Sequence, residues 1–189
     1  MAESTIFILI IGIVVAVLFQ VFEITWIDPR LVITILFLLI VPGLYAAFTS
    51  GPFVPSTKKR HKNMLKLANL DKKDVMFDLG CGDGRLVFSA ARHCKKAIGY
   101  ELSIPLIIFG KIRALFHPNA SIKMGNIWKQ DYHEATVIFC YLLPRAMKQF
   151  FKEVWPTLKP GTRVISNAFM MHELEPFEKE GKVYLYVKE

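Results

Sequence analysis

The sequence predicts an α/β fold, in which a mostly parallel, doubly wound sheet with a terminal antiparallel hairpin follows a hydrophobic helical hairpin. Two observations lead to this prediction. The first 50 of the 189 residues are almost uncharged, and short apolar runs alternate with helical patterns after residue 58. Such alternation is typical of a parallel sheet with helices on both faces. We therefore expect two parts, residues 1–50 and residues 51–189.

The first part contains two apolar segments, 5–22 and 31–48, each of 18 residues without a charged side chain. As helices they would each be about 27 Å long, close to the roughly 30 Å hydrocarbon core of a bilayer. Neither segment alternates polar and apolar residues as a one-sided surface helix does. We therefore expect a transmembrane helical hairpin that anchors the chain. The alternatives are a hairpin buried in a protein core, or a second segment made re-entrant by Pro42-Gly43.

Charge is divided unevenly between the two parts. Residues 1–50 hold one basic and three acidic side chains, whereas residues 51–189 hold 23 basic and 13 acidic ones. No basic region precedes the first apolar segment, which disfavours a cleaved signal peptide. A basic cluster at 58–62 follows the second segment, so the positive-inside rule places the second part on the cytoplasmic side of the membrane. The cluster suits either anionic lipid headgroups or solvent.

The second part shows an ordered series of strand and helix patterns. Compact apolar runs between turn signals indicate buried strands, and apolar residues spaced by three and four indicate helices. The expected strands are 75–79, 97–101, 121–124, 136–142, 162–167 and 182–187, and the expected helices are 58–70, 86–94, 104–116 and 144–154.

The most informative stretch is the loop Asp78–Arg85, which follows the first expected strand and carries Gly80, Gly82 and Gly84. Ligands of open α/β sheets bind outside the carboxyl ends of the strands, so this loop is placed to contact one. Glycines let the backbone turn sharply and approach a ligand closely. A second acid, Glu101, ends the next strand, and its two oxygens can accept hydrogen bonds from the hydroxyls of a ribose.

This loop favours S-adenosylmethionine over a nicotinamide cofactor. The dinucleotide fingerprint G-x-G-x-x-G requires a third glycine where this chain has Arg85, and no Gly-Lys-Ser/Thr follows as in a P-loop. Asp78 lies two residues before the first of the glycines, Gly80. Its carboxylate would repel a pyrophosphate, but it suits the ammonium group of a methionine moiety. A glycine turn without a ligand would explain neither acid.

Asp78–Gly84 together with Glu101 resembles motifs I and II of class I S-adenosylmethionine-dependent methyltransferases, which have a Rossmann-like fold. Further stretches resemble two narrower groups, the archaeal broad-specificity protein lysine methyltransferases and the mitochondrial methyltransferases of the ATP synthase c subunit and the adenine nucleotide translocase. These stretches are Gly51–Ser56, Phe77–Arg85, Gly99–Glu101, Pro160–Ser166 and Val183–Val187. The resemblance covers about residues 51–189, and it implies methyl transfer from S-adenosylmethionine to a protein lysine.

The resemblance also implies a set of cofactor-binding residues. They are Phe53, Val54, Asp78, Gly80, Cys81, Gly82, Gly84, Glu101 and Asn126. Asp78 and the glycines would hold the methionine end of the cofactor, Glu101 its ribose, and Asn126 would lie near the adenine. Phe53 and Val54 would close over the cofactor.

On the substrate side, the carbonyls of Tyr141 and Leu142 are expected to orient an acceptor amine, with the Tyr141 hydroxyl as a further partner. The stretch Tyr141–Pro144 departs from the Asn/Asp-Pro-Pro-aromatic signature found at this position in methyltransferases of other amines. The sequence therefore does not fix the methyl acceptor. The alternatives to a protein lysine methyltransferase are a lipid or quinone methyltransferase and a non-catalytic cofactor-binding membrane module.

No metal site is expected, because the three cysteines are far apart and no ligand cluster accompanies them. The expected partners are the bilayer and a protein substrate that offers a lysine. Nucleic acid is not expected as a partner, because basic and aromatic residues are not interleaved as in RNA-binding segments.

Overall fold

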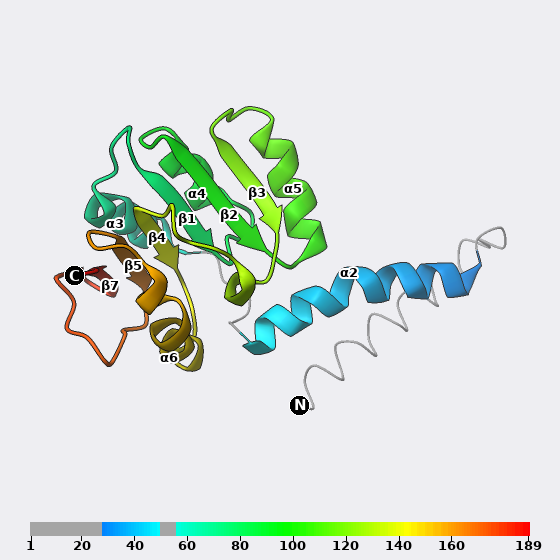
Figure 1. Ribbon diagram of the computed structural model, residues 1–189. Helices are drawn as coiled ribbons and strands as arrows, with labels where there is room; N and C mark the ends of the chain where they lie inside the picture. Colours follow the sequence, from blue (N-terminus) through cyan, green and yellow to red (C-terminus); the bar gives the residue numbers. More distant parts are fainter. Residues whose placement is uncertain (1–27, 50–55) are drawn as a thin grey trace. The chain divides into compact units, whose positions relative to one another are not determined.

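The computed structural model describes residues 28–49 and 56–189 (Figure 1). The chain divides into two compact units, residues 1–38 and 39–189. The predicted apolar segment 5–22 lies outside the described residues. So do the residues next to the predicted domain boundary at position 51, and this boundary stays a prediction.

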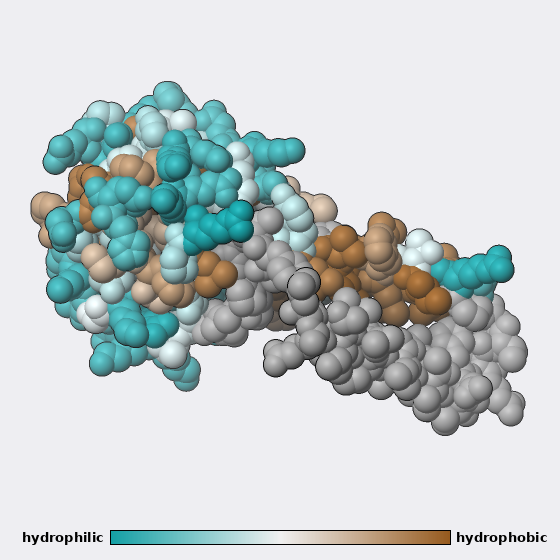
Figure 2. Space-filling model, turned by 90° about the horizontal axis from the view of Figure 1, so that it is seen from below, coloured by the Kyte–Doolittle hydropathy of each residue, from teal (hydrophilic) through white to brown (hydrophobic). Residues whose placement is uncertain are grey.

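Helix α2 (Pro29–Thr49) contains the second apolar segment. It begins after Asp28, whose Oδ1 accepts a hydrogen bond from the Arg30 backbone N–H at 2.8 Å and so satisfies one free donor of the first turn. Hydrophobic residues follow one another along the helix (Figure 2). Nevertheless, none of the helices that the described residues form is long and apolar enough to cross a membrane. The predicted transmembrane hairpin is therefore not confirmed.

The described part of the α/β domain contains a seven-stranded sheet with the order β3-β2-β1-β4-β5-β7-β6. The first five strands in sequence are parallel, and β7 runs antiparallel to both β5 and β6. Their bounds are β1 (Val75–Leu79), β2 (Lys96–Glu101), β3 (Ala120–Met124), β4 (Val137–Cys140), β5 (Arg163–Asn167), β6 (Glu178–Glu180) and β7 (Val183–Val187). The predicted sheet and its terminal antiparallel hairpin are thus confirmed.

Helices cover both faces of this sheet, which explains why its central strands are continuously apolar. On one face, Met64, Val87 and Ile122 belong to the same buried cluster, which joins α3 and α4 to the sheet, and Gly110 packs α5 against Ile122. On the other face, Met147 and Phe150 of α6 pack in a second cluster. The helices are α3 (Lys58–Ala68), α4 (Arg85–Ala91), α5 (Ile104–Ala114) and α6 (Pro144–Glu153), with 3₁₀ turns at Ile127–Lys129 and Trp155–Thr157.

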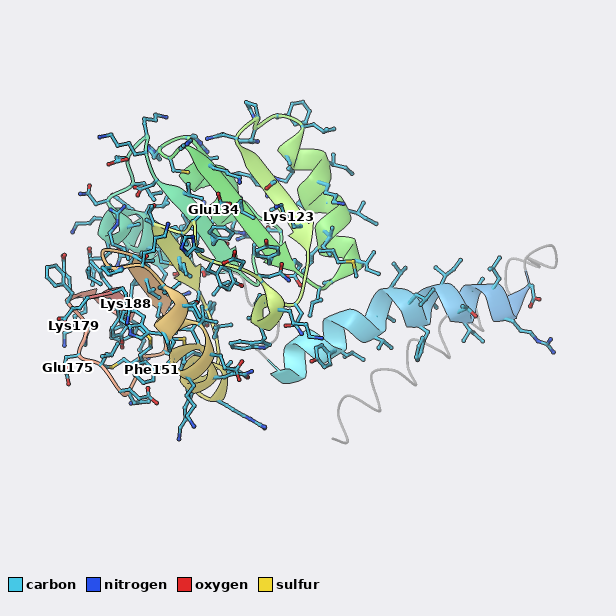
Figure 3. The ribbon with its side chains drawn as sticks, viewed as in Figure 1. Lys123, Glu134, Phe151, Glu175, Lys179 and Lys188 are labelled. Atoms are coloured by element: carbon cyan, nitrogen blue, oxygen red, sulfur yellow. The ribbon has the colours of Figure 1, made fainter. Side chains whose placement is uncertain are left out.

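The shortest strand, β6, was not predicted. Its sequence Glu178-Lys179-Glu180 is charged and partly or fully exposed, because it forms an outer edge of the sheet and has no apolar face to bury. Figure 3 shows its Lys179 far from Lys123, which lies on the opposite edge strand β3. Gly181, with φ of +62°, turns the chain from β6 into β7. The charge at this edge discourages pairing with other strands.

A partly buried ion pair ties helix α3 to the amino ends of strands β1 and β5. Arg163 Nη2 lies 2.6 Å from Asp74 Oδ1, and Arg163 Nη1 donates to the carbonyls of Ala68 and Asn69 where α3 ends. Thr136 Oγ1 donates to the same carboxyl oxygen at 2.7 Å. Burial raises the pKa of Asp74, but these and other hydrogen bonds outweigh that effect, so its pKa lies below the usual value. The pair therefore fixes α3, which forms one side of the site described below.

We expect Arg163→Met to lower the free energy of unfolding by about 3 kcal/mol, because it leaves the Asp74 carboxylate buried without its cation. Lys96→Met is the control, since it removes a more exposed pair with Glu134 and should cost less than about 1 kcal/mol. Urea unfolding followed by circular dichroism measures both changes. Equal losses in the two variants would contradict the structural role of the Arg163–Asp74 pair.

Candidate functional site

A cavity lies at the carboxyl ends of β1, β2 and β4, where open α/β sheets bind their ligands. Seven of the predicted site residues line it, namely Asp78, Gly80, Cys81, Glu101, Asn126, Tyr141 and Leu142. Gly82 and Gly84 lie in the same loop but are not among its lining residues. Phe53 and Val54 lie outside the described residues. The structure thus brings most of the predicted site together, while the role of each residue stays a prediction.

The glycine loop turns sharply between β1 and α4. The backbone N–H groups of Gly80 and Cys81 both donate to the Tyr100 carbonyl at 3.0 Å, which holds the loop against β2. Gly80 has a φ of +76°, and a Cβ added to it would meet no atom within 4 Å. At Gly84, with φ of +74°, a Cβ would lie 2.7 Å from the Phe88 ring. Gly80 therefore leaves room for a ligand, and Gly84 lets α4 begin close to the loop.

Glu101, the last residue of β2, holds three backbone donors. Its Oε2 accepts from the Gly82 N–H at 2.9 Å, and its Oε1 accepts from the N–H groups of Leu102 at 2.8 Å and Ser103 at 2.9 Å. A carboxylate has about four acceptor positions, so Oε2 is the oxygen with capacity left for a ribose hydroxyl. Glu101 therefore organises the loop, and Oε2 is the atom that would make the predicted ribose contact.

Asp78 is a buried carboxyl group without a cationic partner. It is 7% exposed, and none of the ion pairs between described residues includes it. Burial, together with the nearby carboxylates of Glu101 and Asp83, raises the pKa of Asp78 to about 7. Two buried acids beside an open glycine loop favour a cationic ligand, because a positive charge would offset the cost of keeping them ionised. The residues therefore fit the ammonium and ribose of S-adenosylmethionine.

The rim of the cavity includes charged groups that the sequence did not single out. Asp83 Oδ2 accepts from Arg85 Nη2 at 2.7 Å, and Arg113 Nη1 donates to the Asp83 carbonyl at 3.0 Å. His61 of α3 also lines the cavity, and burial followed by the charge of Arg85 lowers its pKa. No local sequence pattern marks His61, because its position at the site depends on how α3 packs on the sheet.

The far side of the cavity is formed by loops that follow β3 and β4. Asn126 Oδ1 accepts from the Trp128 N–H at 3.0 Å and so begins the 3₁₀ turn, which leaves this oxygen only partly free for an adenine. Tyr141 is half-buried, with its ring centre 6.2 Å from that of Phe169, and Leu142 is buried. Ser56 lies on the same cavity and accepts a hydrogen bond from Asn167. Asn167 lies behind this lining, and no sequence pattern singled it out.

A metal site in a protein usually needs several ligating side chains close together. Among the residues that the structure describes, no group of three or more His, Cys, Asp or Glu side chains is placed to hold a metal ion. Burial, followed by the charges of Asp78 and Glu101, raises the pKa of Cys81 well above its usual value, so its thiol stays protonated.

This sheet order, with a glycine loop after β1 and an acid at the end of β2, defines a class I methyltransferase. Residues 78–178 match the family described as the ANTKMT methyltransferase domain. The chain is 36% identical over 151 residues to a protein-lysine N-methyltransferase of Saccharolobus islandicus (strain REY15A), covering 72% of this chain and 92% of that protein. It is 30% identical over 134 residues to the lysine N-methyltransferase of the ATP synthase c subunit from Mus musculus, covering 69% of this chain and 54% of that protein.

Solved structures agree with this assignment. The crystal structure of an RNA methyltransferase from Salinibacter ruber in complex with S-adenosyl-L-homocysteine is similar with a TM-score of 0.68 and 32% identity, covering 71% of this chain and 94% of that chain. A methyltransferase from Thiobacillus denitrificans shares the fold, with a TM-score of 0.52 and 18% identity over 60% of this chain and 49% of that chain.

The chain belongs to the ANTKMT methyltransferase domain family of S-adenosylmethionine-dependent methyltransferases. The predicted fold family, enzyme class and cofactor are thereby confirmed.

Cofactor affinity should depend on pH, because Asp78 titrates near neutrality. Below its pKa of about 7, the group must lose a proton to bind the cofactor ammonium, so Kd should rise as pH falls, approaching about tenfold per pH unit. Above that pKa the affinity should level off. Isothermal titration calorimetry across neutral pH measures this dependence.

Asp78→Asn should remove this pH dependence and weaken binding at alkaline pH by about tenfold or more. Asp83→Asn is the comparison variant, because it removes a neighbouring charge that contributes less than burial and Glu101 to the raised pKa of Asp78. It should keep the pH dependence and move it only slightly to lower pH. An unchanged pH profile in Asp78→Asn would contradict the role assigned to this carboxylate.

Proposed function

We propose that this enzyme transfers the methyl group of S-adenosylmethionine to the side-chain amine of a protein lysine. The observation that carries the proposal is the relationship to a protein-lysine N-methyltransferase that spans 92% of that protein. The cavity is compatible with this acceptor, because buried Leu142 and Cys140 and half-buried Tyr141 give its wall beside β4 an apolar character. An apolar wall suits the aliphatic part of a lysine side chain.

S-adenosylmethionine supplies a methyl group that is already activated by its sulfonium. The chain's own residues have mainly to align the cofactor with the acceptor amine and to exclude water from both. Asp78 and Glu101 would bind the cofactor's cationic and ribose groups. The carbonyls of Tyr141 and Leu142 would orient the acceptor amine. An apolar wall favours the neutral amine over the ammonium with its usual pKa of about 10.4. Alignment of two reactants can contribute roughly 7–11 kcal/mol to the lowering of a barrier.

Incubation of the full chain with methyl-labelled cofactor, membranes and cell extract tests the proposal. We expect label in protein, and mass spectrometry of digested protein should find it on methylated lysine. Asp78→Asn should label far less at equal protein concentration, which controls for other methyltransferases in the extract. Label recovered in lipid would favour a lipid or quinone methyltransferase instead. Cofactor binding without a labelled product would favour a non-catalytic membrane module.

RNA is a second candidate acceptor, because the similar Salinibacter ruber structure is described as an RNA methyltransferase and is 32% identical. The net charge of +8 is compatible with binding a polyanion. The same labelling experiment separates the candidates, since ribonuclease would release label from RNA and protease would release it from protein.

We further propose that a two-helix anchor attaches the chain to a membrane, with the α/β domain on the cytoplasmic side. The uncharged segments 5–22 and 31–48 support this attachment. Leu31, Phe37 and Leu38 of α2 are each more than half exposed, although a helix in water would bury such side chains.

The outer surface of α5 also supports a membrane location. A stripe of exposed apolar side chains, spaced by three and four residues, follows this helix and its C-terminal end, namely Ile108, Phe109, Ile112, Leu115 and Phe116. Between Glu101 and Asp131 the sequence holds four lysine or arginine residues and no acid. An apolar stripe in a basic, acid-free segment suits the surface of an anionic bilayer.

The expressed chain should stay in the membrane pellet after alkaline carbonate extraction. The double variant Val14→Lys/Val15→Lys should reduce the pelleted fraction, since each charge at the centre of a span costs about 2.5–3.5 kcal/mol. Phe177→Lys is the control, because it adds a charge at an exposed apolar position of the α/β domain. Protease applied from the cytoplasmic side should digest the domain. Release of the unmodified chain by carbonate would contradict the attachment.

A further inference from the structure

Asn167, the last residue of β5, has a buried side chain that is only half satisfied. It is 0% exposed, and its Nδ2 donates to Ser56 Oγ at 2.9 Å. Its Oδ1 is the buried side-chain polar atom for which the described residues provide no hydrogen-bond partner. Because buried polar groups of folded proteins are nearly always paired, this free acceptor is a candidate contact for a bound group.

The backbone next to Asn167 holds the amide in place. Ala168 adopts a φ of +71°, which is unusual for a residue with a Cβ, and its N–H donates to the Lys182 carbonyl at 2.7 Å. The bond from Asn167 Nδ2 to Ser56 then fixes the orientation of the side chain itself. The amide group is therefore held in place by the hydrogen bond of its nitrogen and by the fixed backbone beside it.

The sheet register places Asn167 next to residues that line the cavity, although Asn167 itself lies behind the lining. Cys140 of β4 pairs with Ser166 of β5, so Tyr141 and Asn167 are the next neighbours along the two strands. Asn167 lies two residues after Ile165, and side chains alternate along a strand, so it faces the same side of the sheet as that residue. Its partner Ser56 and its neighbour Tyr141 both line the cavity.

We propose that Asn167 Oδ1 accepts a hydrogen bond from the amine that receives the methyl group, with Ser56 orienting the amide. This inference rests on the proposed amine-methylating function and names a subsite within it. Asn167 is a positioning residue for the nitrogen, next to the expected carbonyl contacts of Tyr141 and Leu142. The subsite is separate from the acids Asp78 and Glu101, which lie on β1 and β2.

An amide oxygen suits this task better than a carboxylate does. Only a neutral amine has a lone pair with which to attack, and a nearby negative charge would stabilise the protonated, unreactive form. The Asn167 amide accepts a hydrogen bond from the amine without that effect. A carboxylate at this position would therefore bind the acceptor well but move its reactive form to higher pH.

Kinetics of the full chain on the protein fraction labelled in the extract assay test the subsite. Asn167→Leu, which has a similar shape but no acceptor, should raise the apparent KM for that fraction by about tenfold. Its cofactor Kd, measured by calorimetry, should stay within about twofold of the unmodified value, because the substitution lies away from the acids that bind the cofactor. A normal cofactor Kd shows that the fold is intact. Ser56→Ala should give a smaller increase in KM, because it removes the hydrogen bond that orients the Asn167 amide but leaves the acceptor oxygen in place.

Asn167→Asp is the sharper variant. The limb of its pH–rate profile on which the rate rises with pH should move to higher pH by about one unit, because the carboxylate stabilises the ammonium form of the acceptor. A merely structural asparagine would leave this profile unchanged. An unaltered KM in Asn167→Leu, or an unaltered profile in Asn167→Asp, would overturn the subsite while leaving the proposed function intact. Absence of labelled protein with the unmodified enzyme would overturn both.

Discussion

The shape of the site depends on one carboxylate that accepts hydrogen bonds from three backbone N–H groups. Glu101 accepts from the N–H of Gly82 and from those of Leu102 and Ser103, so it joins the glycine loop after β1 to the start of α5. A loop with three glycines has little conformational preference of its own. Glu101 supplies the missing constraint, and Gly80 can then leave open space where a side chain would otherwise fill the cavity.

The same carboxylate sets the electrostatics of the cavity. Glu101 lies close enough to raise the pKa of buried Asp78, and neither acid has a cationic partner among the described residues. Acidic groups are thus concentrated where we predict that the cationic cofactor binds. At the β4–β5 end, the proposed acceptor subsite offers a neutral amide instead. A methyltransferase of amines benefits from this division, because its cofactor is cationic and its nucleophile must be uncharged.

Much of this arrangement follows from local sequence patterns. The buried strands read as continuous apolar runs because helices cover both faces, and the acids Asp78 and Glu101 stand where parallel strands end. Features that depend on distant parts of the chain were not predictable. Asn167 meets Ser56 across 111 positions of sequence, and His61 reaches the cavity only through the packing of α3. Strand β6 escaped prediction because a charged edge strand carries no apolar pattern.

The most direct test is the cofactor affinity of Glu101→Gln, measured by calorimetry beside that of the unmodified chain. The amide is close in size to the carboxylate, but it offers a single acceptor oxygen to three backbone N–H groups, and its NH₂ opposes one of them. If Glu101 organises the loop, affinity should fall by at least about tenfold with the sheet intact by circular dichroism. Unchanged affinity in this variant would contradict the central role of Glu101.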